Sequence, residues 1–365
     1  MLRTLLVLLL ACSGGMALHA DAAPHRAAYR HAPQEEARVQ AAMTVPDDLR
    51  KALAELRLDR ETSDLDRVRR LFEFMVSDDG LALHYQEQPT YDVAGSYAQR
   101  KVNCLSFTMM FIALARASGV EAYAQASEDA LAMDVVDDTV YRAKHIKAGI
   151  DVRGAQYTVD VGWNSIVAQR SPHAISDMQM VSLLRNNNAI ERLRVGDGSG
   201  AMAEIEMAMA LDPDSATIWN NAGVIHWRSG QTDDAEHAFL RTLELEDGHV
   251  GALGNLVGLY RSTGKNRLAA RYEKRLQRVQ SSDPFSQFLM AQDLMKLGAY
   301  DVAASHYRRA IRLLPNQPEF HRSLAEAYQM LGKDRAAHRV REHALSLEQR
   351  KYSRRSIPDA GPGSG

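Results

Sequence analysis

The chain has 365 residues, of which 45% are hydrophobic and 25% are charged, and its formal net charge is −2. These proportions are ordinary for a soluble globular protein, and the length is enough for two domains. Beyond the N-terminal segment, no stretch approaches the ~18 uninterrupted apolar residues that a membrane helix needs, which argues against a multi-span membrane protein.

The charge is unevenly distributed along the chain. Residues 256–365 carry 20 Lys and Arg against 10 Asp and Glu, a net of +10, which leaves −12 for the remainder. A basic surface of this kind suits an acidic partner or an anionic membrane surface. A set of solvated helix faces is the alternative interpretation.

Residues 1–22 are predicted to be a signal peptide, because Arg3 precedes an uncharged apolar run from Leu5 to Ala11. Two processing outcomes stay open. Cys12 in Leu-Ala-Cys-Ser resembles the lipidated cysteine of a lipoprotein, whereas the small residues at 20–22 fit an ordinary cleavage site. Both outcomes predict the periplasm or the outer membrane of a bacterial envelope. Residues 23–43 are predicted to be a linker.

Residues 44–181 are predicted to form an α+β domain. Apolar spacing and helix-start residues predict one helix near residue 47 and a second over 63–75. A third helix, apolar on nearly all sides, begins at Cys104 and ends at Gly119, so we expect it to be buried. Strand signals then follow at 121–126, 139–150 and 156–161.

The last two of these strands are expected to form a hairpin, because Asp151 and Gly154 occupy favoured turn positions. With a two-residue turn at 152–153, His145 and Asp160 would be directly opposed, with Cβ atoms about 4.5–5.5 Å apart. A three-residue turn with a bulge would shift this register.

Cys104 is the only cysteine that remains once the signal segment is removed. A lone thiol in an oxidising compartment is either buried or used chemically. Together with His145 and Asp160 it forms a candidate catalytic triad. The helix N-terminus and an imidazolium favour the thiolate, the histidine moves protons, and the carboxylate orients the histidine.

The order Cys104, His145, Asp160 resembles that of the transglutaminase-like superfamily of papain-like thiol enzymes. The resemblance covers about residues 60–170 and includes Asn-Cys-Leu-Ser-Phe-Thr at 103–108. It implies acyl transfer on amides, in which the thiolate attacks a carbonyl and water or an amine resolves the thioester. Hydrolysis is favoured over cross-linking, because water is the default acceptor.

The second half of the chain has an internal period of 34 residues. Glycine and alanine each recur five times at this spacing, at Gly196, Gly230, Gly264, Gly298 and Gly332, and at Ala201, Ala235, Ala269, Ala303 and Ala337. This resembles the tetratricopeptide repeat (TPR), with five copies over 182–351. The resemblance implies an all-α superhelix whose concave face binds a peptide or an extended protein segment. Residues 352–365 are predicted to be a disordered tail.

Two functional hypotheses follow. The first is an envelope thiol enzyme that acts through a Cys104 thioester and uses the repeats to bind a protein. The alternative is a non-catalytic TPR scaffold or adaptor with a degenerate transglutaminase-like domain. The sequence contains no glycine-rich phosphate loop, metal-ligand cluster or nucleic-acid motif, so we expect no cofactor, no metal and no nucleic-acid partner.

Overall fold

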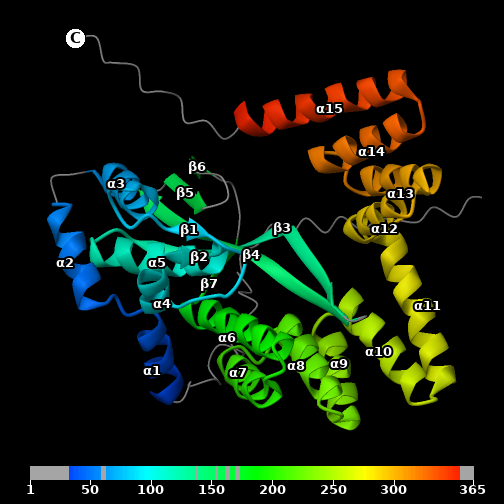
Figure 1. The fold of residues 1–365 in the computed structure, drawn as a ribbon, viewed down its shortest axis with the longest axis horizontal. Helices are drawn as coiled ribbons and strands as arrows, with labels where there is room; N and C mark the ends of the chain where they lie inside the picture. Colours follow the sequence, from blue (N-terminus) through cyan, green and yellow to red (C-terminus); the bar gives the residue numbers. More distant parts are fainter. Residues whose placement is uncertain are drawn as a thin grey trace, which may run out of the picture.

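The computed structural model describes residues 33–58, 63–136, 139–152, 155–160, 165–168 and 173–353. Only the backbone is described for 127–136, 139–145, 155–156, 160, 165–168 and 350–353. The chain has an α+β half followed by an all-helical half that curves beside it (Figure 1). The predicted signal peptide with Cys12, and most of the expected tail, lie outside the described residues. Within the described residues, no helix is both long enough and apolar enough to cross a membrane.

Within the described residues, five helices precede the five-stranded sheet. They are α1 (Pro33–Ala42), α2 (Asp47–Glu55), α3 (Asp64–Val76), α4 (Val93–Gln99) and α5 (Cys104–Ala117). The three helices expected from the sequence are present as α2, α3 and α5. Part of the expected linker is instead folded, because residues 33–42 form α1, which contacts the first helix of the second half.

The strands form one small ladder and one antiparallel sheet. In chain order they are β1 (His84–Tyr85), β2 (Lys101–Val102), β3 (Ala122–Val136), β4 (Thr139–Val152), β5 (Ala155–Asp160), β6 (Ser165–Ala168) and β7 (His173–Ile175). Strands β1 and β2 pair in parallel, and the five-stranded sheet has the order β6-β5-β4-β3-β7. The three strands expected from the sequence are present as β3, β4 and β5. However, β3 extends ten residues past its expected end at residue 126, because it pairs with β4 as far as Val136.

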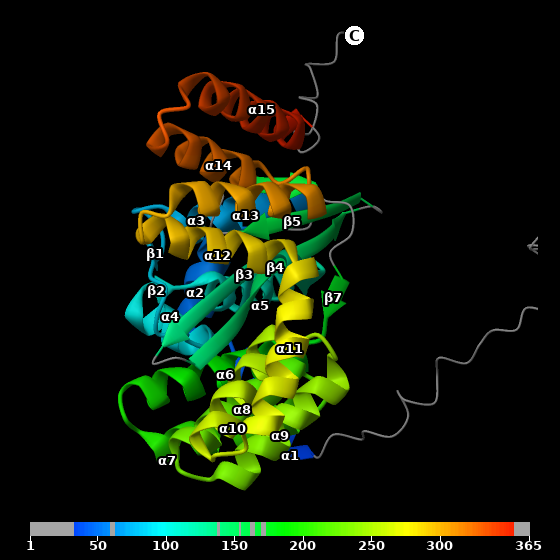
Figure 2. The same ribbon diagram turned by 90° about the vertical axis from the view of Figure 1, so that its right-hand side faces the viewer.

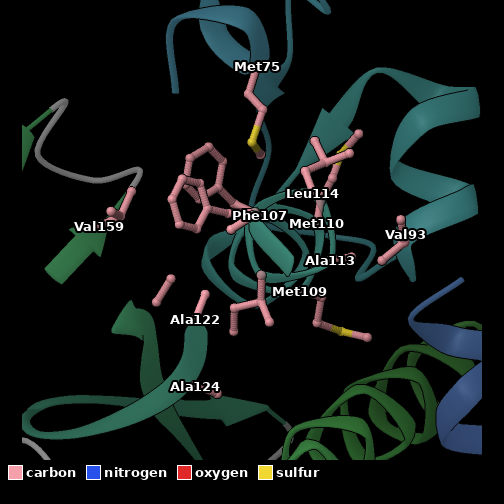
Figure 3. Packing of buried hydrophobic residues seen from close by; sticks show 14 of the residues in the cluster. Met75, Val93, Phe107, Met109, Met110, Ala113, Leu114, Ala122, Ala124 and Val159 are labelled. Atoms are coloured by element: carbon pink, nitrogen blue, oxygen red, sulfur yellow. The ribbon is translucent and has the colours of Figure 1, made fainter. Parts of the chain in front are cut away.

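Helix α5 forms the centre of the first hydrophobic core. Its residues 105–115 are all buried, as the apolar sequence predicts. Figure 3 shows Phe107 at the middle of this core, with Met75 of α3 on one side and Ala122 and Val159 of the sheet on the other. The helix is therefore fixed on several sides, and its N-terminal end has a defined position relative to β4.

Ten helices form the second half as five consecutive pairs. They are α6 (Asp177–Arg194), α7 (Gly198–Leu211), α8 (Ala216–Arg228), α9 (Thr232–Leu245), α10 (Val250–Ser262), α11 (Asn266–Ser282), α12 (Pro284–Lys296), α13 (Tyr300–Leu313), α14 (Pro318–Met330) and α15 (Asp334–Ser353). The predicted all-helical superhelix is thus confirmed. Its first helix begins at Asp177, five residues before the expected boundary, because Ser176 caps it with a full capping box.

The periodic glycines and alanines have the structural roles that the sequence predicts. Each of the five glycines follows the first helix of a pair and has a φ between +68° and +82°, a region that glycine adopts without strain. The five alanines are at most 3% exposed. Their small side chains let the paired helices approach closely.

The buried core of the superhelix has two parts. One extends from Ala189 to Ala269 and the other from Ala291 to Ala327, within the described residues. The first part ends in α11, where Ala269 is the one buried residue. The rest of α11 separates the two parts. Figure 1 shows α11 as the long helix that connects the lower repeats to the upper ones. The stack therefore consists of repeats one to three and repeats four and five.

The two halves meet through the long β3–β4 hairpin. Strand β4 contacts α8 and α10, and β3 contacts α6, so the hairpin lies against the first helices of the first three pairs. Figures 1 and 2 both show it between the lower repeats and the upper repeats, inside the curve of the superhelix. The superhelix thus curves around a part of its own chain.

Candidate functional site

Cys104 is the first residue of α5 and is partly exposed. The residue before it, Asn103, caps the helix, because its side-chain Oδ1 accepts a hydrogen bond from the Ser106 backbone N–H at 2.9 Å. The thiol therefore lies at a helix N-terminus, as the sequence predicts, and the structure shows that this N-terminus is capped. The helix continues behind it into the buried core.

The loop before α5 holds this end of the helix in place. Asn103 Nδ2 donates to Thr90 Oγ1 at 2.7 Å and to the Glu87 carbonyl at 3.2 Å. The Tyr91 backbone N–H donates to Ser106 Oγ at 2.8 Å. Because Asn103 and Ser106 are buried, these bonds also satisfy polar groups that would otherwise be costly to bury.

One hydrogen bond connects the cysteine helix to the histidine strand. Thr108 Oγ1 donates to the Ile146 carbonyl at 3.2 Å, and both residues are buried. Thr108 lies one helical turn after Cys104, and Ile146 directly follows His145 in β4. The fold thus brings the helix turn that begins at Cys104 to the part of β4 that contains His145.

The register of β4 and β5 differs from the expected one. Val152 pairs with Ala155, and the ladder continues to Ala148 opposite Val159, so residues 153–154 connect the strands. His145 is therefore not opposite Asp160, and the prediction of direct opposition is wrong. Continuation of the ladder places residue 147 opposite Asp160 and His145 two positions further along β4. The expected turn at 152–153 was displaced by one residue, which moves every pair by two.

The triad of Cys104, His145 and Asp160 stays a prediction. The backbone places the three residues on α5, β4 and β5, and β4 and β5 are neighbours in the sheet. The side chains of His145 and Asp160 lie outside the described part of the structure.

A second polar feature lies on the first helices of repeats one to three. Asparagine side chains form a continuous series there: Asn255 donates to Asn220 at 3.0 Å, Asn220 to Asn221 at 3.2 Å, and Asn221 to Asn186 at 2.9 Å. All four side chains are at most 3% exposed. Buried amides joined in this way fix the orientation of neighbouring helices, because an unpaired amide in the core is costly.

The asparagine series continues into the α+β half. Asn186 donates to Asn187 at 3.4 Å, and Asn187 Nδ2 donates to Thr90 Oγ1 at 3.2 Å. Thr90 is the same residue that accepts from Asn103. Seven side chains thus connect α10 to the residue before Cys104.

Sequence reasoning missed this series, although a signal was present. Asn-Asn occurs at 186–187 and again at 220–221, which is one repeat period later. The same phase of the next repeat contains Asn255. Polar residues that recur with the period of the core alanines indicate an equivalent position in repeats one to three, and four of these asparagines are buried there.

Comparison with protein families matches the second half of the chain. A family described as tetratricopeptide repeat matches residues 186–248 and 221–284, and one described as TPR repeat matches residues 291–332. The chain contains tetratricopeptide repeats. The repeats predicted from the 34-residue period are thereby confirmed. No curated protein matches the chain.

Solved structures of the protein MamA are similar to part of this TPR chain. One MamA crystal structure is 18% identical, with a TM-score of 0.28 over 45% of this chain and 96% of that chain. MamA from Desulfovibrio magneticus RS-1 is 15% identical, with a TM-score of 0.27 over 47% of this chain and 96% of that chain.

Proposed function

We propose that this protein is a TPR scaffold of the bacterial envelope that binds an extended segment of another protein. The stack of five helix pairs is the observation that carries the proposal. Repeats of this type expose long helix faces in a curved array, and they bind protein segments by contact along several repeats at once. The signal peptide predicted from residues 1–22 supports the envelope location.

The α+β half has a structural role in this proposal. Its β3–β4 hairpin lies against the first helices of repeats one to three, and its Thr90 accepts from Asn187 of the first repeat. Both features would hold repeats one to three in a single curved arrangement. The α+β half would thus set the shape of the binding surface, and this role does not require Cys104 to react.

The test is binding to a purified partner. A photo-crosslinker placed on the exposed surface of α12 in cells would capture the partner, which is then purified and titrated against the protein by calorimetry. We expect saturable one-to-one binding that is unchanged within twofold in Cys104→Ala. Loss of binding in this variant, or the absence of saturation with every captured protein, would contradict the scaffold function.

A second function is supported by a specific observation, the capped N-terminus of α5. It places the only thiol of the described residues at a helix start, one turn from the bond to β4. A thiol enzyme of the transglutaminase-like type needs this arrangement, with His145 as the base. Acyl transfer would then form a Cys104 thioester and release an amine, and water would release the acid.

Alkylation separates the two functions. In a Cys12→Ala background, iodoacetamide reacts with Cys104 alone, and its rate is measured from pH 4 to 9. A catalytic pair predicts fast alkylation that persists below pH 6 and is lost in His145→Ala. A thiol that reacts only on unfolding, or at the same rate in both proteins, would support the scaffold without catalysis.

A further inference from the structure

The contacts of the β3–β4 hairpin indicate which repeats can bind a partner. In the first three repeats, the first helices that face the inside of the curve are contacted by β3 and β4. The last two repeats have their own core and lie beyond α11. The surface of repeats four and five is therefore the part of the superhelix to search for a docking site.

A pocket of about 430 Å³ lies between α13, α14 and α15. Its apolar part comes from Ile311, Leu324 and Val340, one residue from each helix. Leu324 is buried, whereas Ile311 and Val340 are half-buried. An apolar side chain of a ligand placed in this pocket would remove the apolar surface of these residues from water. This burial of apolar surface favours binding.

The same pocket is lined by three arginines, Arg308, Arg312 and Arg339. All three are exposed, and within the described residues none of their side chains forms a hydrogen bond or an ion pair. Nearby Arg322, in contrast, is paired with Glu319 and Glu348. The eight described residues that line the pocket include no Asp or Glu. Among the residues that the structure describes, these three guanidinium groups around an apolar centre thus have no negative partner.

We propose that this pocket binds an acidic protein segment that inserts one large apolar side chain between flanking carboxylates. The apolar residue would contact Ile311, Leu324 and Val340, and the carboxylates would pair with the arginines, whose planar forks suit bidentate binding. The excess of ten positive charges in residues 256–365 would attract such a segment over a longer range. This inference rests on the proposed scaffold function and specifies the partner.

The test selects peptides with the whole protein. A phage library of random twelve-residue peptides is selected on the immobilised chain, and enriched peptides are synthesised with a fluorescent label and titrated by anisotropy. We expect enriched peptides to contain two or more Asp or Glu within three residues of a large apolar residue. Replacement of these acids by Asn and Gln should weaken binding at least tenfold.

Matched variants locate the site. The double variant Arg312→Glu/Arg339→Glu should lower the affinity for the selected peptide at least tenfold. Val340→Asn should lower this affinity severalfold. Arg267→Glu/Arg335→Glu makes the same change in net charge at exposed positions outside the pocket, and it should weaken binding less than threefold. Circular dichroism and the thermal midpoint of each variant confirm that it is folded.

The outcomes distinguish the two proposals. The pocket proposal would be wrong if the selected peptides contained no Asp or Glu, or if both double variants lowered their affinity equally. The scaffold function would stand in either case. Failure to enrich any peptide would overturn both. Binding to vesicles of anionic phospholipid that depends on Arg312 and Arg339, without any peptide selection, would assign the surface to a membrane and also overturn the pocket proposal.

Discussion

Asn187 Nδ2 and Asn103 Nδ2 both donate to the same acceptor, Thr90 Oγ1, at 3.2 Å and 2.7 Å. One threonine hydroxyl thus joins the first repeat helix to the cap of the cysteine helix. Thr90 is only 8% exposed, so water cannot readily replace it as acceptor. The two halves of the molecule therefore share a partly buried polar contact as well as the contacts of the hairpin.

Thr90→Val should destabilise the protein by about 1–3 kcal/mol. The valine keeps the shape of threonine but removes the acceptor, which leaves the buried Asn103 amide and the half-buried Asn187 amide each one partner short. Urea unfolding followed by circular dichroism measures the change. Thr232→Val, at a half-buried position at the start of α9, is the control and should change stability by less than about 0.5 kcal/mol. Equal effects of the two substitutions would mean that the bonds to Thr90 contribute nothing.

Two glycines inside helices should respond to alanine with opposite signs. A Cβ at Gly223 of α8 would lie 2.6 Å from ring atoms of the buried Phe239, whereas a Cβ at Gly254 of α10 would meet no atom within 4 Å. Gly223→Ala should therefore cost about 1–3 kcal/mol through overpacking. Gly254→Ala should stabilise by about 0.5–1 kcal/mol, because alanine favours the helix. Thermal midpoints that move in the same direction would contradict this packing.

The hairpin should protect the lower repeats from hydrogen exchange. Ser127 pairs with His145, so replacement of residues 128–144 by Asn-Gly closes the two strands with a short turn. Strand β4 contacts α8 and α10, and loss of these contacts should raise amide exchange in both helices. Mass spectrometry measures the exchange, with α14 as the internal control. Unchanged exchange in α8 and α10 would show that the hairpin does not hold the repeats.

Acid should weaken the last two repeats through His321. Burial lowers the pKa of His321 below its ordinary value of 6.5, and the neighbouring His343 lowers it further, although the bond to the Pro315 carbonyl acts in the opposite direction. The unfolded chain therefore binds the proton first. The contribution of His321 to the free energy of unfolding is fully present above about pH 6.5 and is lost as the pH falls through the lowered folded pKa.

Urea midpoints between pH 5 and 8 measure this effect. His321→Gln removes the titrating group and should give a flatter pH profile than the natural protein. His338→Gln, whose side chain is 73% exposed, is the control and should keep the natural profile. A profile that is equally steep in all three proteins would show that His321 does not contribute.

The repeats could be predicted from the sequence because their signals are local and recur. Gly230 and its four equivalents adopt positive φ wherever the turn needs it, and Ala235 and its equivalents are buried wherever two helices approach. Each repeat contacts mainly its neighbours, so no long-range information was needed to identify the stack. The buried helix at Cys104 was predictable for a similar reason, since apolar residues on all its faces require burial.

The tertiary structure decided the register of the hairpin and the contacts between the two halves, which no local sequence pattern predicts. A displacement of one residue in the turn after Val152 changed the partner of Asp160, because the register of a hairpin depends on the turn as well as on the apolar pattern. The position of the β3–β4 hairpin inside the curve, and the meeting of Asn187 with Asn103 at Thr90, depend on how the two halves pack. The unpaired arginines around Leu324 likewise come together only when α13, α14 and α15 are stacked. The sequence by itself determined that the repeat helices, the buried helix at Cys104 and the strands around His145 form. Contacts between residues far apart in the chain decided which helices and strands pack against one another. Such contacts depend on the packing of whole elements, which a local sequence pattern does not contain.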